Sequence, residues 1–288
     1  MGKTGGLVLH GFEEHERYPA GVCELIYDRA FTWKMAQASI YNKSTLTCDA
    51  SSDQTRSTAG TQKMIELYFA ATPNGQKVSI ALEELGLPYE IHRIDIGAGD
   101  QFKPEFLAIS PNNRIPAIID RDGIDGNPTS VFESGAILIY LAEKTGQLMP
   151  ADGVGRKTVL EWLMWQMGGF GPMLGQAHHF NHYAPETIDY AVTRYSKEAN
   201  RLYGVLDRQL EGRDFVADDF SIADIAIFPW TRTYQRQHVE IEDYPNVKRW
   251  RKRMISRPAV AKGMQAGSEF NADLRELSPE EWKRLFGA

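Results

Sequence analysis

The chain has 288 residues, of which 42% are hydrophobic and 24% charged, and its formal net charge is −6. This composition indicates a globular protein long enough for two domains, and it excludes a fibrous or largely disordered chain. No apolar run reaches the roughly 20 residues of a membrane-spanning helix, and the first residues lack a signal-peptide pattern. We therefore expect a cytoplasmic protein whose partners include neither nucleic acid nor a membrane.

Residues 1–63 show no sustained hydrophobic periodicity and carry as many acidic as basic residues. Because residues 44–63 are rich in Ser, Thr, Gly and Asp, we expect an N-terminal extension, partly flexible, that ends in a linker. The only cysteines, Cys23 and Cys48, lie in this segment. Any sulfur chemistry in the rest of the chain must therefore come from a bound thiol.

From Met64 onward the hydrophobic pattern becomes regular and predicts alternating strands and helices. In chain order we expect a strand at 65–70, a turn at 72–75, a helix at 76–85, a strand at 88–96, a helix at 104–109, strands at 115–119 and 129–132, and a helix at 133–144. The order β-α-β-α-β-β-α is that of a thioredoxin-like domain, with a parallel first unit and an antiparallel final hairpin.

A Gly- and Pro-containing connection at 146–155 marks the expected domain boundary, and helical patterns follow it at 157–167, 188–210 and 247–254. Residues 168–172 predict a kink or break, and Ser221 with Asp224 predicts a capping box. The fold class expected is an α/β thioredoxin-like N-terminal domain plus an all-α C-terminal domain. The domains are 64–145 and 153–265, with a helical or loose tail at 266–288.

Residues 112–143 contain the most informative local pattern in the chain. Pro116 begins an otherwise strand-like apolar run, and a cis Ile115–Pro116 bond would explain this placement and turn the Ile115 backbone outward. Glu133 and Ser134 then open an amphipathic helix, whose free N–H groups suit a carboxylate ligand. An ordinary capping pair is the alternative for Glu133 and Ser134 taken alone.

Two further positions carry candidate chemistry. Thr72 and Asn74 lie at the first strand-to-helix turn, where a hydroxyl and an amide could stabilise a thiolate, although a plain turn with an N-cap explains them equally well. His178 and His182 have a spacing that could hold a metal, but without a third ligand they predict no metal site and instead suggest the polar wall of a cavity.

Taken together, these features resemble the cytosolic glutathione transferases over about residues 64–265. Finer motifs are similar to the bacterial Nu-class branch of disulfide-bond reductases, which is related to the yeast nitrogen-regulatory prion protein. The motifs that carry this resemblance are Thr72–Lys77, Gly97–Phe102, Ser110–Ala117 and Leu174–Phe180.

The resemblance implies one or two molecules of glutathione per site as co-substrate, and no metal. Thr72 and Asn74 would be the catalytic residues that stabilise the sulfur. The residues expected to bind glutathione are Asn74 near the sulfur, Gln101 and Arg114 near the glycine end, Ile115 and Pro116 at the cysteinyl backbone, Glu133 and Ser134 at the γ-glutamyl end, and Arg194 from the helical domain. A surface ion pair with Glu198 is the alternative for Arg194.

The activity implied is glutathione-dependent disulfide-bond reduction, with glutathione peroxidase activity and weak transferase activity, in a homodimer that acts on a small disulfide or hydroperoxide. The bound glutathione thiolate would act in place of an enzyme cysteine. The alternative is a non-catalytic interaction or regulatory protein, for which residues 1–63 could be the interaction arm. A maleylacetoacetate-type isomerase is disfavoured because its Ser-rich active-site turn is absent.

Overall fold

A computed structural model of the protein describes residues 64–268 and 278–286, which belong to one compact unit. The predicted N-terminal extension with both cysteines, and part of the predicted tail, lie outside these residues. In the part of the chain that is described, no helix is long and apolar enough to cross a membrane.

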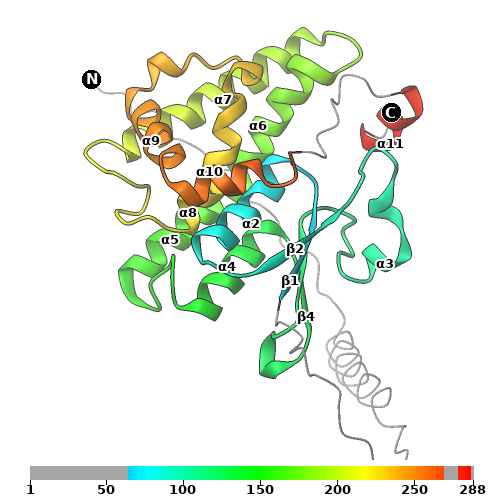
Figure 1. The fold of residues 1–288 in the computed structure, drawn as a ribbon. Helices are drawn as coiled ribbons and strands as arrows, with labels where there is room; N and C mark the ends of the chain where they lie inside the picture. The colour runs from blue at the N-terminus through cyan, green and yellow to red at the C-terminus, as the bar shows by residue number, and fades with distance from the viewer. Residues whose placement is uncertain (1–63, 269–277, 287–288) are drawn as a thin grey trace, which may run out of the picture. The chain divides into compact units, whose positions relative to one another are not determined.

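The first half contains one four-stranded sheet, shown in Figure 1. Its strands are β1 (Ile65–Phe69), β2 (Tyr89–Arg93), β3 (Ala117–Asp120) and β4 (Thr129–Phe132), in the spatial order β2-β1-β3-β4. β1 pairs with β2 in parallel and with β3 antiparallel, and β3 pairs with β4 antiparallel. This topology confirms the predicted thioredoxin-like order, including the parallel first unit and the final hairpin.

The two faces of the sheet bury different clusters. Ile65, Leu67 and Phe69 alternate along β1 and are buried in the main core. α2 (Pro73–Glu84) and α4 (Ser134–Thr145) pack on this face, whereas Phe106 of α3 (Pro104–Leu107) belongs to a separate small cluster. Figure 1 accordingly shows α2 and α4 on one side of the strands and α3 on the other. The period-two pattern of β1 is therefore explained by one face that is buried under α2 and α4 and an opposite face, carrying Glu66 and Tyr68, that stays partly exposed.

The first helix begins earlier than the sequence pattern predicted. Pro73 is its first residue, and the Thr72 hydroxyl accepts a hydrogen bond from the Gly75 N–H at 3.3 Å as an N-cap. The prediction of a separate turn at 72–75 is therefore wrong in extent, because proline is well suited to the first helical position. Gly75 is needed there, since a Cβ would lie 2.3 Å from the Ala70 carbonyl oxygen.

The second half is helical, as predicted. Its first elements are α5 (Gly153–Trp165), a π-helical turn (Gln166–Phe170), α6 (Gly171–His178), a second π-helical turn (His179–Tyr183) and α7 (Asp189–Gln209). They are followed by α8 (Ile222–Ile227), a 3₁₀ segment (Phe228–Gln237), a short 3₁₀ turn (Ile241–Asp243), α9 (Pro245–Ile255), α10 (Pro258–Gln265) and α11 (Pro279–Phe286). Of the kink or break predicted at 168–172, the break is wrong, because the Gly171 N–H bonds to the Gln166 carbonyl and the helix continues through a π turn. A kink is compatible with such a turn.

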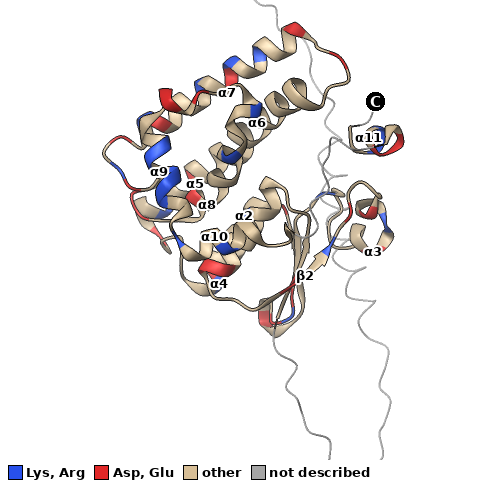
Figure 2. Cartoon of the chain, turned by 45° about the horizontal axis from the view of Figure 1, so that its top comes forward, with Lys and Arg blue, Asp and Glu red and all other residues tan. Residues whose placement is uncertain are grey.

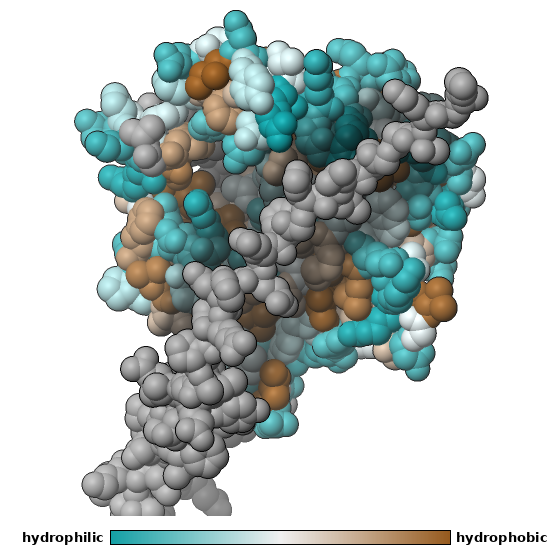
Figure 3. Space-filling view, turned by 180° about the vertical axis from the view of Figure 1, so that it is seen from behind, coloured by the Kyte–Doolittle hydropathy of each residue, from teal (hydrophilic) through white to brown (hydrophobic). Residues whose placement is uncertain are grey.

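The surface carries charges of both signs, many of them joined in ion pairs. Figure 2 shows basic residues gathered on α9, where Arg253 pairs with Asp214 at 2.7 Å and Lys248 pairs with Glu242. Hydrophilic side chains cover much of the coloured surface seen in Figure 3, and smaller hydrophobic areas lie among them. Exposed ion pairs of this kind contribute little to stability, so the fold depends mainly on its interior.

The strongest polar anchor of the helical half is the buried carboxylate of Asp224. It accepts hydrogen bonds from the Val216 N–H at 3.0 Å, from the Trp250 indole N–H at 2.8 Å and from the Ser221 N–H at 3.2 Å. Ser221 caps α8 in return, which confirms the predicted capping box. Complete burial raises the pKa of Asp224 to about 6, while its hydrogen bonds act in the opposite direction.

We predict that Asp224→Ala lowers the free energy of unfolding by roughly 3–5 kcal/mol, because four buried donors, including the Ser221 hydroxyl, lose their acceptor. Chemical denaturation of the purified variant measures the change. Asp219→Ala is the matched control, since Asp219 lies nearby but is exposed, and it should shift stability by no more than about 0.5 kcal/mol. Equal stability of the two variants would contradict the structural role assigned to Asp224.

Candidate functional site

Two adjoining pockets lie where the sheet meets the helical half. The inner pocket, with a volume of about 250 Å³, is lined by Pro116, Glu133, Ser134 and Met167 among others. The outer pocket, of about 540 Å³, includes the residues Thr72, Gln101, His179, Trp230 and Phe286. Asn74, Arg114 and Ile115 line both pockets. All predicted site residues except Arg194 therefore lie in this cleft.

The N-terminus of α2 opens into the outer pocket. Thr72 and Asn74 line that pocket, and the first N–H groups of the helix provide the positive end of its dipole. The Thr72 hydroxyl accepts from Gly75, so its own proton is available to another acceptor. A thiolate placed here would meet a hydroxyl donor and a helix start together.

Asn74 is held in one orientation by the helical half. The Trp230 indole N–H lies 3.1 Å from Asn74 Oδ1. Because an indole nitrogen can only donate, it fixes the carbonyl oxygen of the amide toward Trp230 and leaves the Asn74 NH₂ group for a ligand. Sequence reasoning missed Trp230, since the two residues lie 156 positions apart.

The Ile115–Pro116 peptide bond is cis, as the sequence suggested. The pairing of β3 with β1 ends at Ala117, so Ile115 lies just beyond the ladder and lines both pockets. The Ser110 hydroxyl donates to the Arg114 carbonyl at 2.7 Å and holds the loop before the proline. This arrangement suits main-chain pairing with an extended peptide.

Glu133 and Ser134 occupy the start of α4. Glu133 is the N-cap with a φ of 70°, an uncommon conformation for a non-glycine residue, and its carboxylate accepts from the Asn112 amide at 3.3 Å. Ser134 is buried, yet it contributes to the inner pocket. A carboxylate and a hydroxyl next to free helix N–H groups can together bind an amine and a carboxylate.

Lys77 is a buried cation behind Ser134 that sequence reasoning missed. Its ammonium lies 3.3 Å from Ser134 Oγ, 2.7 Å from Gln166 Oε1 and 3.4 Å from Met167 Sδ. Burial lowers the pKa of Lys77 to about 7. The available signal was a lysine three positions before Ile80 on the apolar face of the first helix.

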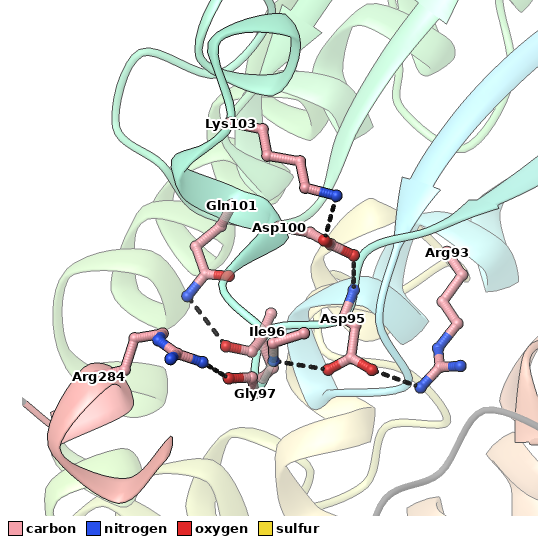
Figure 4. Close-up of polar contacts among 9 residues, drawn as sticks. Arg93, Asp95, Ile96, Gly97, Asp100, Gln101, Lys103 and Arg284 are labelled. Carbon is pink, nitrogen blue, oxygen red and sulfur yellow. Dashed lines mark hydrogen bonds and ion pairs between the residues drawn. The ribbon is translucent and has the colours of Figure 1, made fainter. Parts of the chain in front are cut away.

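Gln101 is held in a loop that joins β2 to α3. Its side-chain NH₂ donates to the Ile96 carbonyl at 3.1 Å, while Oε1 is buried without a partner among the described residues. Figure 4 shows the polar contacts around this loop, in which the Asp95 N–H donates to the Asp100 carboxylate at 2.9 Å. The free Oε1 of Gln101 fits a role as acceptor for a ligand N–H.

The helix α11 contributes apolar side chains to the outer pocket. Leu285 and Phe286 line it, and the Phe286 ring lies 4.9 Å from the His179 ring. The Trp282 indole N–H donates to the Tyr183 carbonyl at 3.2 Å, and Arg284 donates to the Gly97 carbonyl, a contact visible in Figure 4. The helical alternative predicted for the tail therefore holds for residues 279–286.

The predicted histidine wall is formed by a different residue. His179 lines the outer pocket, whereas His178 and His182 do not. Burial, with the nearby Arg236 as a second cause, lowers the pKa of His178 to about 4, so its ring is neutral. Within residues 64–268 and 278–286, no group of three or more His, Cys, Asp or Glu could hold a metal ion.

Arg194 lies apart from the other predicted site residues. It is exposed on α7 and lines a separate pocket with Tyr190 and Glu198. Glu198 forms its ion pair with Arg201 at 2.7 Å and not with Arg194. A role for Arg194 in glutathione binding stays a prediction.

The cleft and its surroundings define a class: a thioredoxin-like domain that presents a cis-proline and two helix starts, joined to a helical domain. Comparison with known proteins identifies the family. The model of the glutathione S-transferase N-terminal domain matches residues 71–144, and that of the C-terminal domain matches residues 172–258. The chain belongs to the glutathione S-transferase family.

Similar proteins include a curated enzyme and two solved structures. The disulfide-bond oxidoreductase YfcG of Escherichia coli K12 is 53% identical over 211 residues, which are 72% of this chain and 98% of that protein. A glutathione transferase family member from Pseudomonas fluorescens, crystallised with two glutathione bound, is 47% identical with a TM-score of 0.68, over 72% of this chain and 95% of that chain. A glutathione transferase from Pseudomonas putida, with one glutathione disulfide per subunit, is 47% identical with a TM-score of 0.69, over 73% and 94%.

Proposed function

We propose that the protein is a glutathione-dependent disulfide-bond reductase in which the thiolate of bound glutathione is the nucleophile. The observation that carries the proposal is the Trp230–Asn74 hydrogen bond, because it orients an amide donor at the boundary of the two pockets. The similarity to YfcG and to glutathione-bound relatives supports the same reading. The absence of cysteine from residues 49–288 rules out a nucleophilic thiol of the protein's own in that part of the chain.

In this proposal glutathione lies along the cleft with its γ-glutamyl end in the inner pocket. Ser134 and the helix start of α4 bind its carboxylate, and Glu133 binds its amine. The Ile115 backbone pairs with the cysteinyl residue beside Pro116, while Gln101 and Arg114 serve the glycine end. Arg194 is retained as a further binding residue on the basis of the resemblance alone. The sulfur then lies near Thr72 and Asn74.

The chemistry is two successive thiol–disulfide exchanges. The glutathione thiolate attacks one sulfur of a small disulfide, forms a mixed disulfide and releases the other half as a thiolate. A second glutathione thiolate attacks the mixed disulfide at the glutathione sulfur, so that glutathione disulfide forms and the remaining thiol leaves. Two glutathione molecules are oxidised for each disulfide reduced. The protein contributes alignment and thiolate stabilisation.

The same thiolate would reduce a hydroperoxide and would add weakly to electrophiles, so we include peroxidase and weak transferase activity in the proposal. In the peroxidase reaction the thiolate takes one peroxide oxygen and releases an alcohol, and a second glutathione then forms glutathione disulfide and water.

We further propose that the chain acts as a two-fold symmetric homodimer.

We predict that Asn74→Asp lowers kcat for reduction of hydroxyethyl disulfide with glutathione by about 10²–10³-fold, because a carboxylate replaces the amide donor facing the thiolate. The substitution keeps the acceptor for Trp230, so the fold should be preserved. Thr72→Ala should also lose activity, whereas Thr72→Ser, which keeps the hydroxyl and the cap, should retain most of it.

Circular dichroism and thermal melting of each variant control for folding. If the wild-type protein binds glutathione but shows no turnover, the proposed enzymatic activity is rejected and the non-catalytic alternative is favoured. Full activity of Asn74→Asp would reject the assignment of this amide to the thiolate.

We also predict that the Cys23→Ser/Cys48→Ser double variant keeps wild-type turnover, because the nucleophile is supplied by glutathione. The same hydroxyethyl disulfide assay measures it. Loss of turnover in a folded double variant would mean that a protein thiol takes part in the reaction.

A further inference from the structure

The ammonium of Lys77 has hydrogen-bond partners but no counter-ion. Its side chain is only 1% exposed, and its three polar contacts are to the neutral groups of Ser134, Gln166 and Met167. No carboxylate among the described residues forms an ion pair with it; Glu133, its charged neighbour, acts only through space. A buried charge without an opposite charge is costly, so a reason for its presence is expected.

The position of Lys77 relative to the inner pocket suggests that reason. Ser134 and Met167 line the pocket, and both contact the Lys77 ammonium from the other side. Since an ammonium can only donate, Ser134 Oγ accepts from Lys77 and keeps its own proton for another group. In the structure the Ser134 hydroxyl donates to the Met167 sulfur, a weak acceptor, with an Oγ–Sδ distance of 3.7 Å. A ligand carboxylate would be a much better one.

We propose that Lys77 is a positioning residue that supplies the buried positive charge for a ligand carboxylate in the inner pocket, with Ser134 as the hydroxyl bridge between them. The inference rests on the proposed function, which places the α-carboxylate of the γ-glutamyl group at Ser134. The ligand class is therefore a γ-glutamyl compound with a free α-carboxylate. Lys77 does not touch the reacting sulfur, so its effect is on binding.

The protonation of Lys77 gives this inference a measurable signature. Desolvation lowers the pKa of Lys77 to about 7, with Glu133 acting in the opposite direction. A carboxylate bound at Ser134 favours the charged form and raises this pKa. Below pH 7 the lysine is already charged and binding needs no proton. Above pH 7 binding must take up a proton, so the affinity falls by up to about tenfold per pH unit.

The experiment is isothermal titration calorimetry of the full chain with S-methylglutathione between pH 6 and 8, in buffers of different ionisation enthalpy. This probe lacks a thiol, so the only groups that can titrate are those of the protein and the amine and carboxylates of the probe. The wild type should take up close to one proton per ligand near pH 8. Lys77→Met should bind at least about tenfold more weakly at pH 6.5 and show no pH dependence.

Two matched comparisons separate the charge from a structural role. Gln166→Glu places a carboxylate where Lys77 already has an acceptor, at 2.7 Å, so the lysine keeps its partner but gains an internal counter-ion. It should weaken binding and abolish proton uptake while the protein remains folded, whereas a purely structural role predicts unchanged binding. The S-methylated 4-aminobutyryl analogue of glutathione, which lacks the α-carboxylate, should bind wild type and Lys77→Met equally.

The outcomes are distinguishable from failure of the proposed function. If the wild type does not bind S-methylglutathione, the proposed function fails. If it binds without proton uptake, or if Gln166→Glu and the wild type bind alike, the role of Lys77 fails and the proposed function stands. His179→Gln tests the histidine that lines the adjoining outer pocket: loss of proton uptake in that variant, but not in Lys77→Met, would also overturn the inference. Should Lys77→Met fail to fold, Gln166→Glu decides.

Discussion

The hydrogen bond from Trp230 to Asn74 connects the two halves of the molecule at the place where the chemistry is proposed. It joins the first turn of α2 to the 3₁₀ segment after α8, and it fixes an amide that lies on the boundary between the two pockets. Neither half alone would hold that amide in this orientation. The cleft therefore forms only when the two halves pack together. Their contact determines that the NH₂ end of the Asn74 amide, and not its oxygen, is left for a ligand.

Much of the fold could be predicted because its signals are local. The succession of strands and helices along the chain, the capping box of Ser221 and the cis bond before Pro116 depend on residues close together in the chain. The errors arose where one pattern suits two structures. Thr72 with Pro73 is typical of both a turn and a helix start, and paired glycines at 168 and 169 are compatible with a break or with a π turn.

The contacts that complete the site could not be predicted, because they join residues far apart in sequence. Lys77 meets Gln166 across 89 positions, and Arg284 reaches the loop at Gly97 across 187. The local sequence pattern predicted which residues line the cleft. It could not predict the distant residues that hold them in their orientations. Two of the buried charged groups illustrate the difference: Asp224 is enclosed by donors within its own helical half, whereas Lys77 leaves its charge uncompensated behind the inner pocket.

The two pockets differ in a way that fits the proposed reaction. The inner pocket is smaller and is built on helix starts, a cis-proline and a buried lysine, which suits one fixed chemical group. The outer pocket is about twice as large and is partly lined by His179, Trp230 and Phe286, which suits ligands of differing shape. Residues 49–288 contain no cysteine, so that part of the chain supplies no reacting sulfur, and in the proposed exchange the attacking thiolate and both disulfide sulfurs belong to ligands. An inner pocket that holds the γ-glutamyl end of glutathione would fix its sulfur near Thr72 and Asn74, beside a roomier pocket for the second ligand, which is the arrangement that the proposed reaction needs.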